Sequence, residues 1–490
     1  MSLTTLRSLG IVQLAFSGPP LVLDRATWDN PVGSTWSLVE GVVQTLGTGS
    51  SLLSAGSIVS PAFAGSISLD LMLNNTGTVT LHGGDLLLYG AVESRFGAWS
   101  LHNAATLSFL GGGTIYSGTL LVPSADASLA VGVGDLCEPP PLSTSVPPLP
   151  VFSTLESVVV NCTGSFVATK VDLVVLGPFL STKSTTVDGA RLSFGLEREV
   201  DEEESSVAVV MSGAVEVRSG VLRVSKTASV SGTLTIGSEA ETRGRDLIAL
   251  LEFSAESRME SFGPRVAVLR GGVLNINSDF SEEGSQLEQL RVGGSLNYNG
   301  ARGMIVGSLE LVGGLLSSSA SVTVQDSLVW ESGTILGQEP LVSINHTTFS
   351  SNGFKLLDGR ELVLQGYCLW NSTSALSLNN DARVTLDDGG FLEFVEASVV
   401  SQSVNARAKL VNRGTILVNA FSPAYAFLMD LDVVNERGGH IHFLAGALRF
   451  SSLGQFNNTG GTLLLNNQVL SFPHVTISFP CFVVVWRGGG

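Results

Sequence analysis

The sequence predicts an all-β protein that folds as a parallel β-helix, or β-solenoid, with coils of about 20–25 residues. Two sets of evenly spaced residues and the runs between them support this prediction. Glycine pairs between apolar residues recur at steps of 22 and 20 residues, and a single glycine follows 20 residues later, at Gly271, Gly293, Gly313 and Gly333. An Asn–Gly phrase recurs every 23 residues, at Asn412, Asn435 and Asn458, and it also occurs at Asn75.

The runs between these corners have the length and alternation of short β-strands. Examples are residues 78–81, 221–224 and 382–386, which are rich in Val, Leu, Ile and Thr. The asparagines and glycines are expected to supply positive-φ corners. One coil cannot bury its own inner face, but stacked coils align their apolar residues in columns and stack their Asn amides at the corners. An antiparallel sandwich does not require a fixed recurrence of one corner residue, and a leucine-rich repeat would need Asn where Ser295 stands.

Composition restricts the protein class further. The chain has 490 residues, of which 44% are hydrophobic and only 14% charged, with 56 glycines, so it has ample apolar surface to bury and is not intrinsically disordered. Its formal net charge of −17 would repel a nucleic-acid backbone, so no nucleic-acid partner is expected. No stretch reaches the roughly 18 apolar residues of a membrane helix, so none is expected in this chain.

Composition also suggests a division into five parts. Residues 1–33 form an N-terminal segment in which Arg7 and the residues 15–17 make a weak secretory-signal pattern, with a first strand as the alternative interpretation. Residues 34–137 and 151–480 form two solenoid segments, and residues 138–150, which hold six of the 17 prolines, link them. Residues 481–490 form a C-terminal tail. The charged run 196–204 is expected to be an exposed loop.

The four cysteines show no metal-binding spacing. Cys137 and Cys162 flank the Pro-rich linker, and a disulfide between them would close it and contribute on the order of 3 kcal/mol. Buried free thiols are the alternative interpretation.

Residues 327–472 resemble right-handed parallel β-helix surface proteins of the pectin-lyase-like class, which is used in adhesins and autotransporter passengers. The residues that carry the resemblance are 328–335, 357–362 and the three Asn–Gly corners at Asn412, Asn435 and Asn458. Residues 34–135 resemble the latter part of another copy, with Trp36, Asn75 and the pair Gly83-Gly84. The resemblance implies an extracellular or cell-surface location.

Parallel β-helices also host polysaccharide lyases and glycosidases, so candidate catalytic residues need examination. The polygalacturonase-like pattern combines Asn-Thr-Asp, Asp-Asp, Gly-His-Gly and Arg-x-Lys on one face of successive coils, where paired carboxylates protonate the leaving oxygen and activate water. This chain has Asp387-Asp388 and Arg407-x-Lys409 but lacks the other two elements. The catalytic interpretation of these four residues therefore competes with a polar corner before Gly389-Gly390.

A second candidate site is a histidine pair. His440 and His442 lie two residues apart and so on one face of a strand, where two imidazoles could bind a transition metal. Because Ile441 and Phe443 are the natural inward pair, the histidines are expected on the outer wall, in solvent. No cofactor is expected.

Three functional hypotheses follow from this repeat without a complete catalytic set. The leading one is a non-enzymatic extracellular or cell-surface solenoid, a structural stalk or adhesin that makes multivalent contacts with glycans or surface proteins. The second is a carbohydrate-active enzyme on the same scaffold. The third is a part of a larger surface protein without independent activity.

Overall fold

The structure is a computed structural model of the chain. It describes residues 4–7, 9–15, 19, 21–45, 50–62, 64–95, 97–103, 105–109, 113–116, 119–122, 128–132, 152–156, 159–162, 165–169, 172–175, 178–188, 190–194, 209–225, 227–238, 248–254, 259–278, 286–396, 399–402, 407–419, 426–445, 447–450, 455–465, 470–471, 477–478 and 484–486. These residues are strands joined by corners, with no helix among them, and they stack as the parallel coils of a β-solenoid. The predicted fold class is confirmed.

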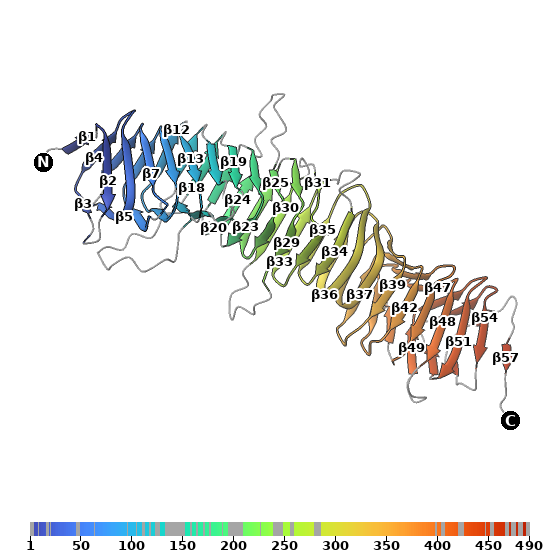
Figure 1. Cartoon of the computed structure of the whole chain (residues 1–490). Coiled ribbons are helices and arrows are strands. Elements are labelled where there is room, and N and C mark those ends of the chain that lie inside the picture. Colours follow the sequence, from blue (N-terminus) through green and yellow to red (C-terminus); the bar gives the residue numbers. More distant parts are fainter. Residues whose placement is uncertain are drawn as a thin grey trace. The chain divides into compact units, whose positions relative to one another are not determined.

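The chain divides into two compact units, within each of which strands of successive turns stack side by side (Figure 1). Unit 1 comprises Met1–Gly237 with Thr242–Gly263, and unit 2 comprises Ser238–Glu241 with Pro264–Gly490. In both units each turn contributes a strand to three parallel sheets, because a strand pairs with its equivalent one coil away.

The three sheets of unit 1 are named 1A, 1B and 1C. Sheet 1A contains β1 (Thr4–Arg7), β4 (Ala26–Asn30), β6 (Ser51–Ser54), β9 (Met72–Asn75), β12 (Val92–Arg95), β15 (Gly113–Tyr116), β18 (Phe152–Glu156), β21 (Asp172–Val175), β24 (Ala190–Phe194), β27 (Gly220–Val224) and β30 (Ala249–Phe253). Sheet 1B contains β2 (Ile11–Ala15), β5 (Thr35–Thr45), β7 (Ser57–Ser60), β10 (Thr78–Leu81), β13 (Ala98–Leu101), β16 (Thr119–Val122), β19 (Val159–Cys162), β22 (Phe179–Ser181), β25 (Val209–Met211), β28 (Ala228–Val230) and β31 (Met259–Ser261). Sheet 1C contains β3 (Leu21–Leu23), the second half of β5, β8 (Ser66–Leu69), β11 (Asp85–Leu88), β14 (Thr106–Phe109), β17 (Ser128–Gly132), β20 (Ser165–Thr169), β23 (Ser184–Asp188), β26 (Ala214–Val217) and β29 (Thr233–Ile236).

The sheets of unit 2 are named 2A, 2B and 2C, and the long strands β36 (Met304–Ser318) and β37 (Val322–Gly337) bend through all three. Sheet 2A also contains β32 (Arg265–Val268), β34 (Gln286–Val292), β39 (His346–Phe349), β42 (Tyr367–Trp370), β45 (Phe391–Phe394), β48 (Thr415–Asn419), β51 (His440–Ala445), β54 (Thr462–Leu465) and β57 (Val484–Trp486). Sheet 2B also contains β33 (Gly272–Ile276), β35 (Ser295–Tyr298), β40 (Lys355–Asp358), β43 (Leu376–Asn379), β46 (Val399–Gln402), β49 (Ala426–Asp430), β52 (Ala447–Phe450) and β55 (Leu470–Ser471). Sheet 2C also contains the start of β34, β38 (Leu341–Ser343), β41 (Glu361–Leu364), β44 (Arg383–Leu386), β47 (Lys409–Asn412), β50 (Asp432–Asn435), β53 (Phe456–Asn458) and β56 (Ile477–Ser478).

The interior of each unit is filled by columns of apolar side chains. Alternate residues of most strands are buried, as the period-2 geometry of a strand requires. In sheet 2A the buried column is aromatic over four turns: Trp330, Phe349, Trp370 and Phe394 follow one another with ring centroids 5.8, 4.4 and 5.3 Å apart. Stacking of large side chains in one column therefore supplies much of the apolar burial here.

Three of the four predicted glycine corners require the left-handed conformation. Gly271, Gly313 and Gly333 have φ of 74, 84 and 104°, which favours glycine over any residue with a Cβ atom. Gly293 lies outside the left-handed region. The expectation of positive φ there is wrong, and the close approach occurs instead at Gly294, where a Cβ atom would lie 2.3 Å from the carbonyl oxygen of Gly272.

Asn412, Asn435 and Asn458 stack their amides as predicted, but the corner asparagines do not have the predicted backbone conformation. Asn75, Asn412, Asn435 and Asn458 are each the last residue of a strand and fully buried, and none of them has positive φ, so the left-handed interpretation is wrong for all four. In unit 2 their amides form a hydrogen-bonded column from turn to turn. The Nδ2 of Asn412 donates to Oδ1 of Asn435 at 2.8 Å, and Nδ2 of Asn435 donates to Oδ1 of Asn458 at 2.9 Å.

Glycines at these corners leave space for the amides of Asn435 and Asn75. A Cβ atom on Gly439 would lie 2.4 Å from Oδ1 of Asn435, and one on Gly461 would lie 2.2 Å from its Nδ2. In unit 1, a Cβ atom on Gly97 would lie 2.5 Å from Nδ2 of Asn75. At these three positions an inward amide therefore lies beside a residue that has no side chain.

Several predicted features lie wholly or partly outside the described residues. The Pro-rich stretch 138–150, Cys137 and the charged run 196–204 are among them. The strands on either side of the Pro-rich stretch pair directly, β15 with β18, β16 with β19 and β17 with β20, so they belong to successive turns of unit 1. Cys162 is buried on β19, and its disulfide with Cys137 stays a prediction. Residues 4–7 and 11–15 are strands, and the secretory signal stays a prediction.

Candidate functional site

The outer face of sheet 2A carries the candidate site. Its strands alternate between the core and solvent, and their parallel register places the outward residues in two columns along the stack. The first column contains Ser308, Ser327, His346, Tyr367, Phe391, Thr415, His440 and Thr462, and the second contains Glu310, Val329, Thr348, Leu369, Glu393, Leu417, His442 and Leu464. We call this surface the outer wall.

Three consecutive turns of the first column form an aromatic ladder outside the core. The ring of Tyr367 stacks on His346 with centroids 5.5 Å apart and on Phe391 with centroids 5.8 Å apart, and the interplanar angles are 21° and 14°. Tyr367 is 39% exposed, and the other two rings are half-buried. Large aromatic side chains held in register on a solvent-facing wall provide apolar contact area for a ligand.

Glu393 lies beside this ladder in the second column and orders it. One carboxylate oxygen accepts a hydrogen bond of 2.7 Å from the Tyr367 hydroxyl, and the other accepts one of 3.2 Å from Nδ2 of Asn419. The hydrogen bond to Glu393, together with partial burial, raises the pKa of Tyr367 to about 12. The tyrosine therefore remains a neutral donor at physiological pH, and the carboxylate keeps further lone pairs for a ligand hydroxyl.

The two aspartates of the catalytic hypothesis lie at the corner between β44 and β45, which leads into the aromatic ladder. Asp387 accepts a hydrogen bond of 3.3 Å from Nε2 of Gln365 and lies 3.8 Å from the Arg413 guanidinium, which also forms an ion pair of 2.8 Å with Glu436. Asp388 is exposed. Asp387 thus contacts a guanidinium and an amide of the neighbouring turns at this corner.

The structure does not bring the predicted basic residues to this corner. Lys409 is the first residue of β47 and pairs in register with Arg383 and Asp432, at the amino ends of their strands. Asp387 and Asp388 follow the carboxyl end of β44, so the length of a four-residue strand, about 10 Å, separates the two groups. The backbone amide of Arg407 donates to Asp381, again at the far end. The four residues therefore do not converge on one reacting bond.

The two histidines lie on the outer wall, as their spacing predicts. His440 is exposed and His442 half-buried, while Ile441 and Phe443 face the core. Their ring centroids are 6.1 Å apart. Burial and the neighbouring His440 lower the pKa of His442. Among the described residues no group of three or more His, Cys, Asp or Glu side chains could hold a metal ion, so the pair has no third ligand of these types there.

A buried lysine in sheet 2B forms a hydrogen-bonded cluster with serines. The ammonium of Lys355 donates to Oγ of Ser372, to Oγ of Ser374 and to the carbonyl of Gly353, each at 3.1 Å. Both serine hydroxyls donate in turn to carbonyl oxygens, Ser372 to Ser351 at 2.5 Å and Ser374 to Gly353 at 2.6 Å. The hydroxyl protons point away from the lysine, so the cluster ties two corners together rather than activating a nucleophile.

This lysine predicts a pH dependence of stability. Burial lowers the pKa of Lys355 from 10.5 to about 8, an effect that Glu331 offsets in part. The unfolded chain therefore binds more protons than the folded chain between pH 8 and 10.5, and the contribution of Lys355 to stability rises with pH across that window. We expect the unfolding free energy of the wild type to gain on the order of 2 kcal/mol relative to Lys355→Met from pH 8 to 10.5.

Urea denaturation of both proteins at a series of pH values checks this expectation. The difference between them cancels the titration of all other groups, provided these titrate alike in the two proteins. A difference that stays flat from pH 7 to 10.5 would show that the lysine has an ordinary pKa in the fold.

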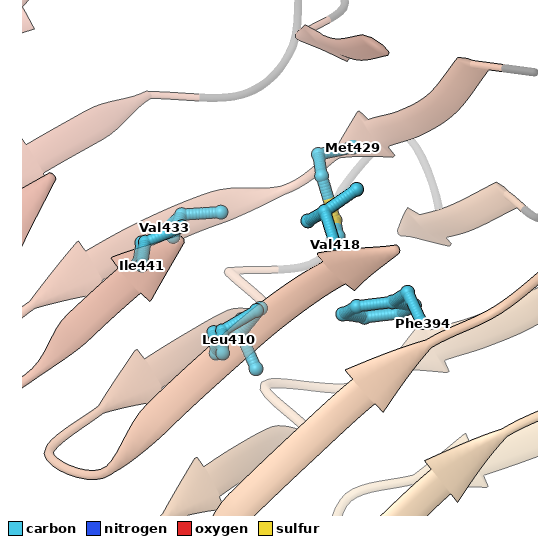
Figure 2. Close-up of a pocket in the computed structure, with 7 residues that line it drawn as sticks. Phe394, Leu410, Val418, Met429, Val433 and Ile441 are labelled. Carbon is cyan, nitrogen blue, oxygen red and sulfur yellow. The ribbon is translucent and has the colours of Figure 1, made fainter. Parts of the chain in front are cut away.

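The interior also contains a small apolar cavity in unit 2 (Figure 2). Seven side chains line it: Phe394, Leu410, Ile416, Val418, Met429, Val433 and Ile441. The cavity volume is about 10 Å³, and its lining is apolar. A void of this size and composition is a packing defect between coils and does not suit a ligand.

Sequence reasoning did not identify Tyr367, Phe391 and Glu393. These residues lie 24 to 26 positions apart between turns and belong to unremarkable runs such as Tyr367–Trp370. Alignment of the strands by their inward residues would have placed the two aromatic rings in one outward column. The signal was present, but it needed the register of each coil.

The described residues contain no helix long and apolar enough to cross a lipid bilayer. No known family matches the chain, and no curated protein or solved structure compared with it does so either. The arrangement of the outer wall is therefore the basis for a functional proposal.

Proposed function

We propose that this protein is a non-enzymatic, extracellular or cell-surface β-solenoid, a structural stalk or adhesin that binds glycans through its outer walls. Each contact is weak, and repetition of similar coils along the stack replaces a single deep pocket by avidity. The observation that carries the proposal is the exposed aromatic ladder of His346, Tyr367 and Phe391 with the carboxylate of Glu393 beside it.

The chemistry of the outer wall suits sugars. The C–H faces of a pyranose pack against aromatic and aliphatic side chains, and its hydroxyls donate to carboxylate oxygens and exchange hydrogen bonds with Ser and Thr. Sites for small ligands combine such apolar contacts with a few placed polar groups. On the outer wall the apolar contacts come from Tyr367, Phe391 and Leu369. The polar groups come from Glu393 and Thr348.

The resemblance to pectin-lyase-like surface proteins supports the same proposal and a location outside the cell. Asn345 and Asn371 begin N-x-S/T sequons and are exposed, so both are accessible acceptors for N-linked glycans in a secreted protein. In full, we propose that the protein is a glycoprotein of the cell surface that binds glycans.

A glycan-array screen of the purified chain tests the proposal, with release of reducing sugar measured on every glycan that binds. We expect binding without sugar release. The variant Tyr367→Ala/Phe391→Ala should weaken that binding about tenfold or more, because it removes most of the aromatic ladder. Ser377→Ala, which faces outward from sheet 2B and so lies off the outer wall, is the matched control and should leave binding unchanged.

Three outcomes contradict this proposal. Sugar release would establish an enzyme and make Asp387, Asp388, Arg407 and Lys409 the first residues to change. Absence of binding to every glycan would contradict the adhesin role. Equal affinities of the wild type and the double variant would remove the aromatic ladder from the binding surface.

A further inference from the structure

The aromatic ladder of the outer wall is interrupted at Thr415. The register aligns Phe391, Thr415 and His440 as equivalent residues of three successive turns. Phe391 stacks on Tyr367 of the preceding turn and on no other ring of the described chain, so its second face looks toward the short side chain of Thr415. His440, the equivalent residue two turns from Phe391, lies on the far side of Thr415. Thr415 is thus the floor of a gap between two rings.

The width of this gap follows from the stacking distance of strands. Neighbouring strands lie about 4.8 Å apart, so Phe391 and His440 are separated by about 9.6 Å along the stack. A ring in van der Waals contact on both faces needs about 7 to 8 Å between its neighbours. A puckered pyranose chair is thicker than a flat ring and fills the remaining space. The gap therefore has the width of one sugar ring.

Polar groups stand beside the gap in the second column. Glu393, Leu417 and His442 are the equivalent residues of the same three turns, so Leu417 extends the floor and the other two lie at the rims. The Glu393 carboxylate is held in place by Tyr367 and Asn419 and retains lone pairs. The His442 ring offers a donor and an acceptor nitrogen in its neutral form.

The charge around the gap selects among sugars. Four carboxylates lie on the surrounding residues of these turns, together with two guanidinium groups: Asp387, Asp388, Glu393 and Glu436 against Arg413 and Arg437. Arg413 is already paired with Glu436 and lies 3.8 Å from Asp387. The whole chain carries a net charge of −17. Uronic and sialic acids are therefore repelled, and an uncharged hexose is favoured.

We propose that the Thr415 gap binds one uncharged pyranose unit of a polysaccharide, sandwiched between Phe391 and His440, with its hydroxyls on Glu393 and His442. The proposal rests on the glycan-binding function above and specifies its ligand class and subsite. Binding to one ring is weak, and neighbouring sugar units gain contact along the same wall.

The experiment introduces a larger side chain at residue 415, where the sugar is proposed to bind. Thr415→Phe continues the aromatic ladder into the space for the sugar, and Thr415→Ser keeps the space open as the matched control. Isothermal titration with cellohexaose, maltohexaose and mannohexaose, and with oligogalacturonate as the anionic comparison, measures binding. We expect an uncharged oligosaccharide to bind, Thr415→Phe to weaken it about tenfold or more and Thr415→Ser to change it less than about twofold.

A second variant keeps the proposal testable if Thr415→Phe does not fold. His440→Ala removes one side of the gap without adding bulk and should weaken the same oligosaccharide about fivefold. Circular dichroism verifies the fold of each protein. One outcome would refute the sugar site at Thr415 but not the glycan-binding function. In that outcome Thr415→Phe and His440→Ala bind as the wild type does, and Tyr367→Ala/Phe391→Ala does not bind. Preference for oligogalacturonate would refute the charge argument, and no binding to any probe would overturn both proposals.

Discussion

Replacing Trp370 by alanine is expected to lower the free energy of unfolding by about 4 kcal/mol. Trp370 is 2% exposed and stacks between Phe349 and Phe394, with ring centroids 4.4 and 5.3 Å away. Alanine would leave a cavity of nearly a whole indole in a column whose neighbours belong to rigid paired strands. Urea denaturation followed by circular dichroism measures the change.

Two further variants separate the core column from the wall. Nε1 of Trp370 has no hydrogen-bond partner among the described residues, so Trp370→Phe strands no polar group and should cost only about 1 kcal/mol. Tyr367→Ala, in the same strand but facing outward, should also cost about 1 kcal/mol because its ring is partly solvated. Equal losses for Trp370→Ala and Tyr367→Ala would contradict the assignment of inner and outer faces.

Replacing Asn435 by alanine is expected to destabilise the fold by about 3 kcal/mol, although asparagine is a polar residue. Its amide is the middle of a buried three-residue column and bonds to Asn412 at 2.8 Å and to Asn458 at 2.9 Å. Alanine would remove a partner from Nδ2 of Asn412 and from Oδ1 of Asn458, both buried away from water. The loss of hydrogen bonds by two buried groups, rather than lost apolar contact, sets the size of the effect.

Asn457→Ala is the matched control for this substitution. Asn457 lies on β53 next to Asn458 but faces outward, so its loss should change the unfolding free energy by less than about 0.5 kcal/mol. Denaturation curves for both variants, measured side by side, decide the question. If Asn435→Ala is as stable as Asn457→Ala, the buried amide column does not stabilise the coils.

Several features of the fold could be predicted from particular residues of the sequence. The 23-residue step of Asn412, Asn435 and Asn458 predicted stacked coils because a corner that recurs at one interval must occupy one column. The alternation around Ile441 placed both histidines outside. The predicted stacking of the asparagine amides is confirmed, but the predicted positive φ is wrong, because each of the three asparagines ends a strand without a left-handed turn.

Neither the outer wall nor the failure of the catalytic hypothesis could be predicted without the register of strands in successive coils. Asp387 and Lys409 are 22 residues apart in sequence, about one coil, yet they lie at opposite ends of neighbouring strands because the coil between β44 and β47 has its own length. Tyr367, Phe391 and Thr415 share one column only because the pairing of β42, β45 and β48 aligns their first residues.

The local features of each coil can be predicted from the sequence: strand-length apolar runs, corners with glycine, stacked amides and a period of one coil. These depend on residue type and on neighbours along the chain, which a sequence displays directly. The register between coils, and with it the set of side chains that meet across turns, becomes visible only when the coils are stacked. Coil lengths vary, and a shift of one residue moves a strand's side chains to the opposite face, so the aromatic ladder and the gap at Thr415 exist only in the stacked protein.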